Sequence, residues 1–251
     1  MHPQHDLQPF LERLTSRSRL NESEQAAILG LPTHAAQVSA HRDFVRLGER
    51  VEHACIVVEG VVGRFGQTSE GGRQITAFFV AGDAPDLHSV VLPKDSSALQ
   101  ALSTSTILRI PHTALRAVAA RYPAVAEAFW RDCSVDAGVA AQRVVNVGRR
   151  DARTRIAHLL CEMAVRYGTR PLRGEVTYTF PITQVHLADA TGLTPVHVNR
   201  TLKTLAAAGL VIVSHRKVRI LDWERLAEVG EFDAEYLQDS YEPEERLRIV
   251  D

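Results

Sequence analysis

Residues 183–210 place the strongest constraint on the fold, because they predict two short amphipathic helices joined by a tight turn. The stretch reads TQVHLADATGLTPVHVNRTLKTLAAAGL, and Gly192 and Leu193 separate the two predicted helices. A connection this short fixes the angle at which the helices cross. Thr194 and Pro195 mark the start of the second helix, since Thr accepts a hydrogen bond from a first-turn amide and Pro has no N–H there to leave unpaired.

The second helix, 195–208, separates apolar residues from polar ones. Val198, Leu202 and Leu205 recur at the spacing that forms one buried stripe, and the polar and cationic side chains fall outside it. After Gly209, the runs LVIV and VRIL predict two short strands joined by SHRK. Helix, turn, helix and β-hairpin in this order predict a winged helix-turn-helix.

The exposed side of the second helix carries side chains suited to double-stranded DNA. A helix-turn-helix places its second helix in the major groove, while flanking cations and amides hold phosphates. Arg200 suits a bidentate pair with guanine, Asn199 a base or a phosphate, and Val196 a thymine methyl group. The predicted DNA-binding set is Thr194, Val196, His197, Asn199, Arg200 and Lys203 in the helix, with His215, Arg216 and Lys217 in the wing.

The net charge of −1 is unevenly distributed along the chain. Residues 149–225 hold 13 Lys and Arg against 6 Asp and Glu, whereas residues 226–251 hold 2 against 9. The basic block coincides with the predicted winged helix and favours a polyanionic partner. For the acidic end we expect a solvated terminus with a short helix around DWERLAEVG, or a segment that binds a partner or covers the basic face.

The first half of the chain predicts a β-roll. After two expected helices in 7–14 and 21–31, the segment 42–111 alternates short runs rich in Val, Ile, Phe and Thr with glycines at nearly regular spacing. Several short strands at this interval predict a sandwich or barrel-like roll. With 251 residues, two domains are expected. The fold class is therefore α+β, with an N-terminal β-roll (jelly roll) and a C-terminal winged helix-turn-helix.

A long helix is expected between the two halves, from Ala124 to about Val147. Its apolar residues recur at steps of three and four, and such a seam needs a cover, either from the roll, from the same helix of a second chain, or from both. We predict a homodimer. The boundaries are 1–123 for the sensory roll, 124–148 for the dimerisation helix, 149–225 for the winged helix and 226–251 for the acidic tail. The seam consists of Val125, Phe129, Cys133, Ala137, Ala140, Val144 and Val147.

Other classes of protein are disfavoured by what the sequence lacks. Its three cysteines are scattered, which argues against a disulfide framework or a thiolate metal cage and fits a reducing cytoplasm. The longest apolar run, LAAAGLVIV, is far below the roughly 18 residues of a membrane span. No HExxH, GxSxG, P-loop or GxGxxG pattern occurs in its required context. We therefore expect a cytoplasmic protein that is not an enzyme, without catalytic residues, metal, cofactor or membrane partner.

The order of roll, long helix and winged helix resembles the Crp/Fnr superfamily of bacterial transcription regulators over nearly the whole chain. The resemblance is carried by GERVEHACIVVEGVVGRF, GRQITAFFVAGD and ITQVHLADATGLTPVHVNRTLKTLAAAGLV. NVGRRDARTRIAHLLCE and EFDAEYL resemble an alphaproteobacterial subgroup. The resemblance implies a homodimer on a palindromic DNA site, RNA polymerase as a partner, and a roll whose ligand or redox state sets the geometry of the two DNA-contacting helices. Val196, Asn199 and Arg200 occupy the base-contacting positions, although Val196 replaces a frequent Glu.

The departures from this family concern the effector. In cyclic-nucleotide-responsive members, a glutamate binds the ribose and an arginine pairs with the phosphate. Asp86 and Ser96 stand at those positions in GDAPDLHSVVLPKDSSALQAL. Loss of the arginine removes the charge that a buried phosphodiester needs, so cyclic nucleotide binding is not expected. The expected pocket for an unknown effector is Asp86, His88, Ser96 and Ser97, and His88 is the candidate for an axial haem ligand.

Two alternatives remain open for the function. No cysteine precedes residue 55, so the chain does not have the roughly four ligands of an iron–sulfur cluster within one subunit. Cys133 on the seam is instead a candidate redox thiol at a dimer contact, which would make the protein a thiol-controlled regulator. The other alternative is a sensory or protein-interaction module of the same fold that no longer binds DNA.

Overall fold

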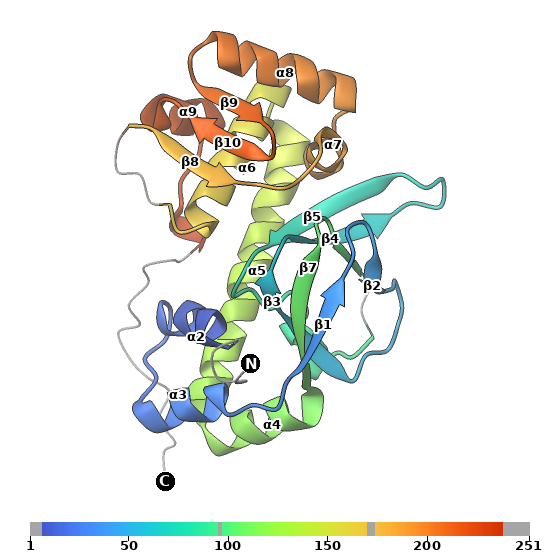
Figure 1. The fold of residues 1–251 in the computed structure, drawn as a ribbon, viewed down its shortest axis with the longest axis vertical. Coiled ribbons are helices and arrows are strands. Elements are labelled where there is room, and N and C mark those ends of the chain that lie inside the picture. The colour runs from blue at the N-terminus through green and yellow to red at the C-terminus, as the bar shows by residue number, and fades with distance from the viewer. Residues whose placement is uncertain (1–6, 95–96, 170–173, 238–251) are drawn as a thin grey trace. The chain divides into compact units, whose positions relative to one another are not determined.

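The computed structural model describes residues 7–94, 97–169 and 174–237 (Figure 1). They divide into two compact units. The first unit holds the roll residues up to Arg64, then Phe78–Gly138, and Leu237. The second unit holds Phe65–Ala77 and Val139–Tyr236. Both the α+β class and the predicted order of roll, long helix and winged helix are confirmed.

The roll consists of two sheets. One has the strand order β1-β7-β3, and the other has the order β2-β6-β4-β5. Antiparallel pairing joins β7 to β1 and β3, and joins β2 to β6. In chain order the strands are β1 His34–Val38, β2 Asp43–Val45, β3 His53–Glu59, β4 Val62–Gln67, β5 Arg73–Phe79, β6 Ala98–Ala101 and β7 Ser105–Pro111.

Alternation along β7 gives the first sheet two different faces. Leu108 and Ile110 join the core that also contains residues of the helices, such as Phe10. Ile107 belongs to a second cluster with Val38, inside the roll. The helices of this part are α2 Gln8–Thr15, α3 Glu22–Leu29, α4 His112–Arg121 and α5 Pro123–Arg149, with the 3-10 turn η1 Leu87–Val90 before β6.

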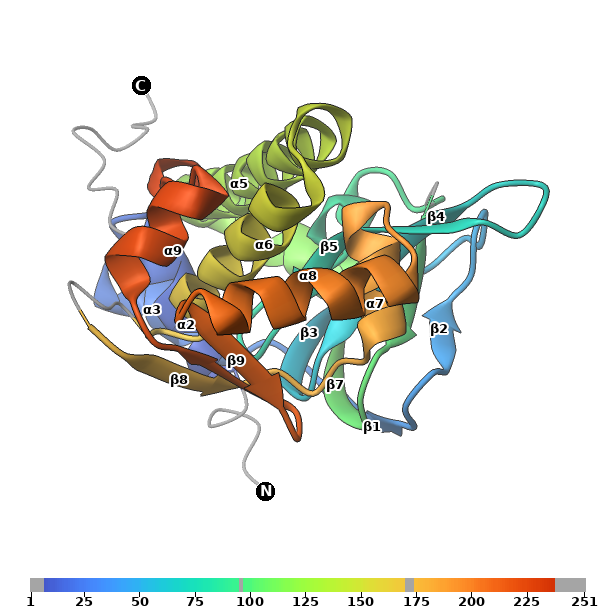
Figure 2. The ribbon, with the colours of Figure 1, turned by 90° about the horizontal axis from the view of Figure 1, so that it is seen from above.

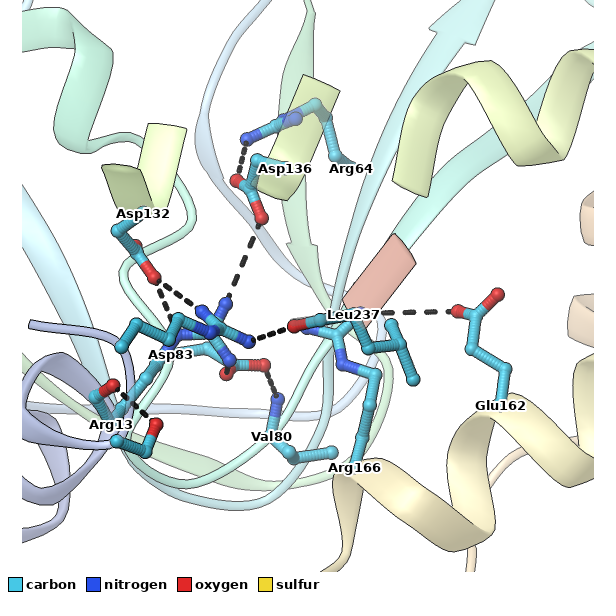
Figure 3. Close-up of polar contacts among 11 residues, drawn as sticks. Arg13, Arg64, Val80, Asp83, Asp132, Asp136, Glu162, Arg166 and Leu237 are labelled. Atoms are coloured by element: carbon cyan, nitrogen blue, oxygen red, sulfur yellow. Dashed lines mark hydrogen bonds and ion pairs between the residues drawn. The ribbon is translucent and has the colours of Figure 1, made fainter. Parts of the chain in front are cut away.

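A cluster of buried charges stabilises the first unit (Figure 3). Arg13 contacts the carboxylate of Asp83, and its Nε donates to Asp132 at 2.8 Å. Arg17 donates to the same Asp132 oxygen at 2.9 Å and to the carbonyl oxygen of Leu237 at 2.8 Å. Because two arginines share Asp132, this carboxylate is the centre of the cluster. Its remaining members are Arg64 and Asp136, 3.2 Å apart.

The second unit is a winged helix-turn-helix. Helix α8 packs on α6 and α7, and β9 follows it (Figure 2). The three strands form one antiparallel sheet in the order β8-β10-β9. The last turns of α5 belong to this unit, where Arg143 donates to Glu162 at 3.0 Å. The elements are α6 Ala152–Arg166, β8 Val176–Thr179, α7 Gln184–Thr191, α8 Pro195–Ala207, β9 Val211–Ser214, β10 Lys217–Ile220, α9 Trp223–Gly230 and η2 Glu235–Leu237.

The second unit extends beyond the predicted boundary at residue 225. The short helix expected around DWERLAEVG is α9, which packs on α6. Gly230 lies against the α6 backbone, and an added Cβ there would come within 2.7 Å of His158 N. His158 Nδ1 donates to Gly230 O at 3.0 Å, and the Tyr236 hydroxyl donates to Glu162 at 3.0 Å. The expected tail is therefore folded up to Leu237, and residues 238–251 lie outside the described residues.

Candidate nucleic-acid interface

The start of α8 has the cap that the sequence predicts. Thr194 is extended and its hydroxyl accepts a hydrogen bond from His197 N–H at 3.2 Å, with Pro195 at the first helical position. Gly192 ends α7 in the left-handed region, with φ +65°. These local choices fix the start of the helix, so the positions that follow have a defined face.

The two faces of α8 are separated as expected. Val198 and Leu205 are fully buried, and Leu202 is half-buried. The side chain of Val196 is 81% exposed. The predicted contact residues Thr194, Arg200 and Lys203 are exposed as well, whereas His197 and Asn199 are half-buried.

Helix α7 contributes a residue to this face that the sequence analysis missed. The Asn199 side-chain amide donates to Gln184 Oε1 at 3.3 Å. Gln184 is exposed in the first turn of α7. The position of Gln184 directly after the N-cap Thr183 could have indicated this residue. The first turn of a helix leaves backbone N–H groups free to bind an anion such as a phosphate.

The wing turn presents three further predicted residues. His215 and Arg216 both have left-handed backbone conformations, with φ of 49° and 63°, and both are exposed, as is Lys217. The backbone N–H of Phe180 donates to Arg216 O at 2.8 Å and so holds the turn against the segment after β8. Arg219, on the neighbouring strand, is instead paired with Glu175 at 3.2 Å.

The cations of α8 and the wing are available to a ligand. Within the part of the chain that the structure describes, Arg200, Lys203, Arg216 and Lys217 form no ion pair. Exposed guanidinium and ammonium groups of this kind bind phosphate and base edges without first breaking a protein contact. One helix and one hairpin therefore present exposed cations of the kind that can bind phosphates or base edges.

The C-terminal end of α7 is held by the β4–β5 hairpin and by α6. Gln74 donates to Ala190 O at 3.1 Å, and Arg155 donates to Thr191 O at 3.0 Å. Arg73 lies 3.9 Å from Asp189. Burial raises the pKa of Asp189, and the positive charge of Arg73 opposes that rise. These contacts fix α7, on which α8 packs.

The predicted dimerisation seam on α5 requires a correction. Val125 and Phe129 are buried in the core of their own chain, where Phe129 stacks on Phe10 with ring centroids 6.3 Å apart. They are therefore not available to a second chain. Cys133, Ala140 and Val147 are half-buried, while Ala137 and Val144 are exposed, Val144 to 69%. Trp130, for which the sequence allows either a place beside the seam or a place against the roll, is exposed, and so is Val145, which the predicted seam does not include.

The residues of the predicted effector pocket differ in burial. Asp86 is fully buried and accepts a hydrogen bond from Cys55 N–H at 2.6 Å, so it attaches η1 to β3. His88 and Ser97 are half-buried, and Ser96 lies outside the described residues. Among the residues that are described, no three or more His, Cys, Asp and Glu side chains have the geometry of a metal site.

The cysteines are poorly suited to redox control. Burial, with Asp132 and Asp136 nearby, raises the pKa of Cys133 to about 12. Burial also raises the pKa of Cys55 and that of Cys161. Since the thiolate is the reactive form, a raised pKa lowers the reactivity of these thiols near neutral pH. The raised pKa of Cys133 is the opposite of what a reactive redox thiol needs.

Comparisons with known proteins agree with this architecture. Residues 154–229 match the Crp-like helix-turn-helix domain, and residues 36–122 match the cyclic nucleotide-binding domain. The nitrogen fixation regulation protein FixK of Azorhizobium caulinodans is 30% identical over 80% of this chain and 79% of its own length. The fumarate and nitrate reduction regulatory protein of Vibrio cholerae is 22% identical over 84% of each chain.

A solved structure shows the same fold. FixK2 from Bradyrhizobium japonicum matches with a TM-score of 0.72 and 25% identity, over 79% of this chain and 98% of that chain. No helix in the described ranges is long and apolar enough to cross a membrane. With its roll, its winged helix and its relatives, this chain belongs to the Crp/Fnr family of DNA-binding transcription regulators.

Proposed function

We propose that this protein is a homodimeric transcription regulator that binds a palindromic DNA site by inserting α8 of each protomer into the major groove. The observation that carries the proposal is the exposed side of α8, where Val196, Arg200 and Lys203 project from a helix fixed by its cap and its buried stripe. A helix of this kind contacts bases with its N-terminal residues. We propose a cytoplasmic location for the protein, because the DNA of a bacterium lies in the cytoplasm.

Each residue of the interface has a proposed role. Arg200 forms a bidentate pair with a guanine, and Val196 contacts a thymine methyl group. Asn199, oriented by Gln184, contacts a base or a phosphate. His197, Lys203, His215, Arg216 and Lys217 bind phosphates, with the Thr194 end of the helix facing the backbone.

The second protomer is proposed to pack on α5. Trp130, Ala137, Val144 and Val145 are exposed on this helix, and large exposed apolar groups mark association surfaces. A symmetric dimer presents two copies of α8 to two half-sites, which accounts for a palindromic target. RNA polymerase is the proposed second macromolecular partner. A small-molecule effector near His88 and Ser97 remains a proposal, and no catalytic step is part of this role.

The experiment first selects bound duplexes from a random pool and then measures affinity for the enriched site against salt. Affinity should fall steeply with added salt because phosphate contacts release counterions. Arg200→Ala should cost about 1–3 kcal/mol and relax the preference at one base pair, whereas Lys217→Ala should weaken all duplexes alike and reduce the salt slope by about 1. Arg219→Ala is the matched control, since Arg219 is exposed but paired with Glu175.

Two results would refute the proposal. If Arg200→Ala binds every duplex as the parent does, Arg200 contacts no base. If selection enriches no sequence and binding shows no salt dependence, the protein is the interaction module that does not bind DNA. Sedimentation of Val144→Asp, which should yield monomers, tests the dimer surface independently.

A further inference from the structure

A cavity of about 560 Å³ opens at one edge of the roll, between β1, the segment that follows it, and β7. Its volume lies in the range of sites for small molecules. The wall residues come from 36–49 and from Arg109, so none of them belongs to η1 or to the loop where the effector residues were expected. An adjoining hollow of about 510 Å³ shares Arg42 and Arg46 with it.

Arg109 faces the inside of the roll. On β7 it lies two residues after Ile107, which belongs to the inner cluster, so both side chains leave the same face of the strand. Arg109 is half-buried, and its Nε atom is buried without a hydrogen-bond partner. It forms no ion pair within the described parts of the chain. A buried donor in this state is destabilising until an acceptor reaches it.

The charges around the cavity favour an anion. The exposed side chains of Arg42 and Arg46 also lack an ion pair among the residues that the structure describes. The two acidic residues of the wall already have partners, because Asp43 accepts from Gln100 at 2.7 Å and Glu49 accepts from the Arg46 backbone N–H at 2.8 Å. The wall thus holds three arginines against two carboxylates and has a net positive charge, and guanidinium pairs best with carboxylate and phosphate.

The rest of the wall is partly apolar. Ala36, Val38 and Phe44 line the cavity beside the arginines, and all three belong to the inner cluster of the roll or pack against it. Such a wall accommodates a short hydrocarbon or aromatic group next to a charged head.

We propose that this cavity binds a small organic anion, whose carboxylate or phosphate group pairs with Arg109 and with Arg42 or Arg46 while its apolar body rests on Val38 and Phe44. The cavity wall shares no residue with η1 or with the predicted DNA-binding set. It does not depend on DNA binding, so its test is independent of the proposed function.

Isothermal titration of the full chain tests the proposal with four probes. Benzoate and phenyl phosphate carry both a head and a body, inorganic phosphate carries the head alone, and benzyl alcohol the body alone. We expect one saturable site per chain for at least one of the first two probes, at least tenfold weaker binding of the last two, and at least a tenfold loss of affinity in Arg109→Met. The control is Arg121→Met, an exposed arginine of α4 outside the cavity, which should bind as the parent does.

Nuclear magnetic resonance locates the site. The backbone amides of Ala36 and Phe44 should shift on titration with the same probes, and these shifts should disappear in Arg109→Met. If that variant does not unfold cooperatively, Arg42→Gln and Arg46→Gln, which change exposed side chains, replace it and should each weaken binding several-fold. The proposal is overturned if neither anionic probe saturates by about 10 mM, if the variants bind like the parent, or if the shifts cluster at η1 instead.

Discussion

Replacing Arg13 with Met removes the guanidinium that joins three aspartates in the buried cluster. Arg13 contacts Asp83, donates to Asp132 at 2.8 Å and lies 3.9 Å from Asp136, while its side chain is only 13% exposed. Deleting one partner of a buried ion pair typically costs about 3–5 kcal/mol, because a charge remains uncompensated.

The expected cost is at the lower end of that range, about 3 kcal/mol. Each aspartate keeps another partner in the variant. Asp132 keeps Arg17 at 2.9 Å, Asp83 keeps the Val80 N–H at 2.7 Å, and Asp136 keeps Arg64. No carboxylate is therefore left wholly unpaired.

The loss should be independent of pH near neutrality. Burial alone would lower the pKa of Arg13, but the carboxylates of Asp132, Asp83 and Asp136 raise the pKa above its ordinary value. A group whose folded-state pKa is raised contributes its full stabilisation below the unfolded-state pKa and loses it only at higher pH. Arg13 thus stays charged in both states between about pH 6 and 9.

Urea denaturation followed by tryptophan fluorescence measures this cost. The chain has two tryptophans, Trp130 in the first unit and Trp223 in the second, so a Trp223→Phe background reports on the first unit alone. The control is Arg131→Met, which removes an i,i+4 pair with Glu127 and should cost about 0.5 kcal/mol. If Arg13→Met unfolds within about 1 kcal/mol of the parent, then desolvation cancels the attraction in this cluster and the reasoning fails.

Three further outcomes are expected. Burial, and after it the positive charge of Arg150, lower the pKa of His158. On acidification the unfolded chain therefore binds a proton at a higher pH than the folded chain does. The free energy of unfolding of the second unit should fall as the pH falls from about 7.5 to 5.5. Urea denaturation at several pH values in that range measures how the free energy of unfolding depends on pH. In His158→Gln this dependence should be shallower by up to the equivalent of about one proton, and an unchanged dependence would contradict the prediction. Gly230→Ala should cost about 1–3 kcal/mol by thermal or urea unfolding because its Cβ meets backbone, whereas Gly148→Ala, with nothing within 4 Å, should be neutral or stabilising. Iodoacetamide at pH 7 should alkylate Cys133 much more slowly in the folded protein than in urea. Equal rates in the two conditions would contradict this and would favour the thiol-controlled regulator.

Local signals made the winged helix predictable. Thr194, Pro195 and Gly192 act through the backbone of one or two turns, and the structure uses each of them as expected. The predicted stripe of Val198 and Leu205 is buried for the same reason, since helical periodicity alone determines which residues share a face.

Non-local features were not predictable from the sequence. Strand β1 has few β-branched residues in HAAQV and forms because its backbone pairs with β7, some seventy residues later in the chain. The apolar period of α5 correctly predicted a helix but did not reveal that Val125 and Phe129 face their own core. Arg13 and Asp132 are 119 residues apart, and no local pattern relates them.

The wing turn places two charged or protonatable side chains at backbone positions that reduce the stability of the fold. His215 and Arg216 both occupy a region of backbone space that costs a residue with a Cβ about 1–2 kcal/mol, and the two-residue hairpin would favour Asn-Gly there. Such a replacement would relax the loop and delete two positively charged or protonatable groups at once. A more heat-resistant form of this regulator, obtained through that loop, should therefore hold its operator less tightly.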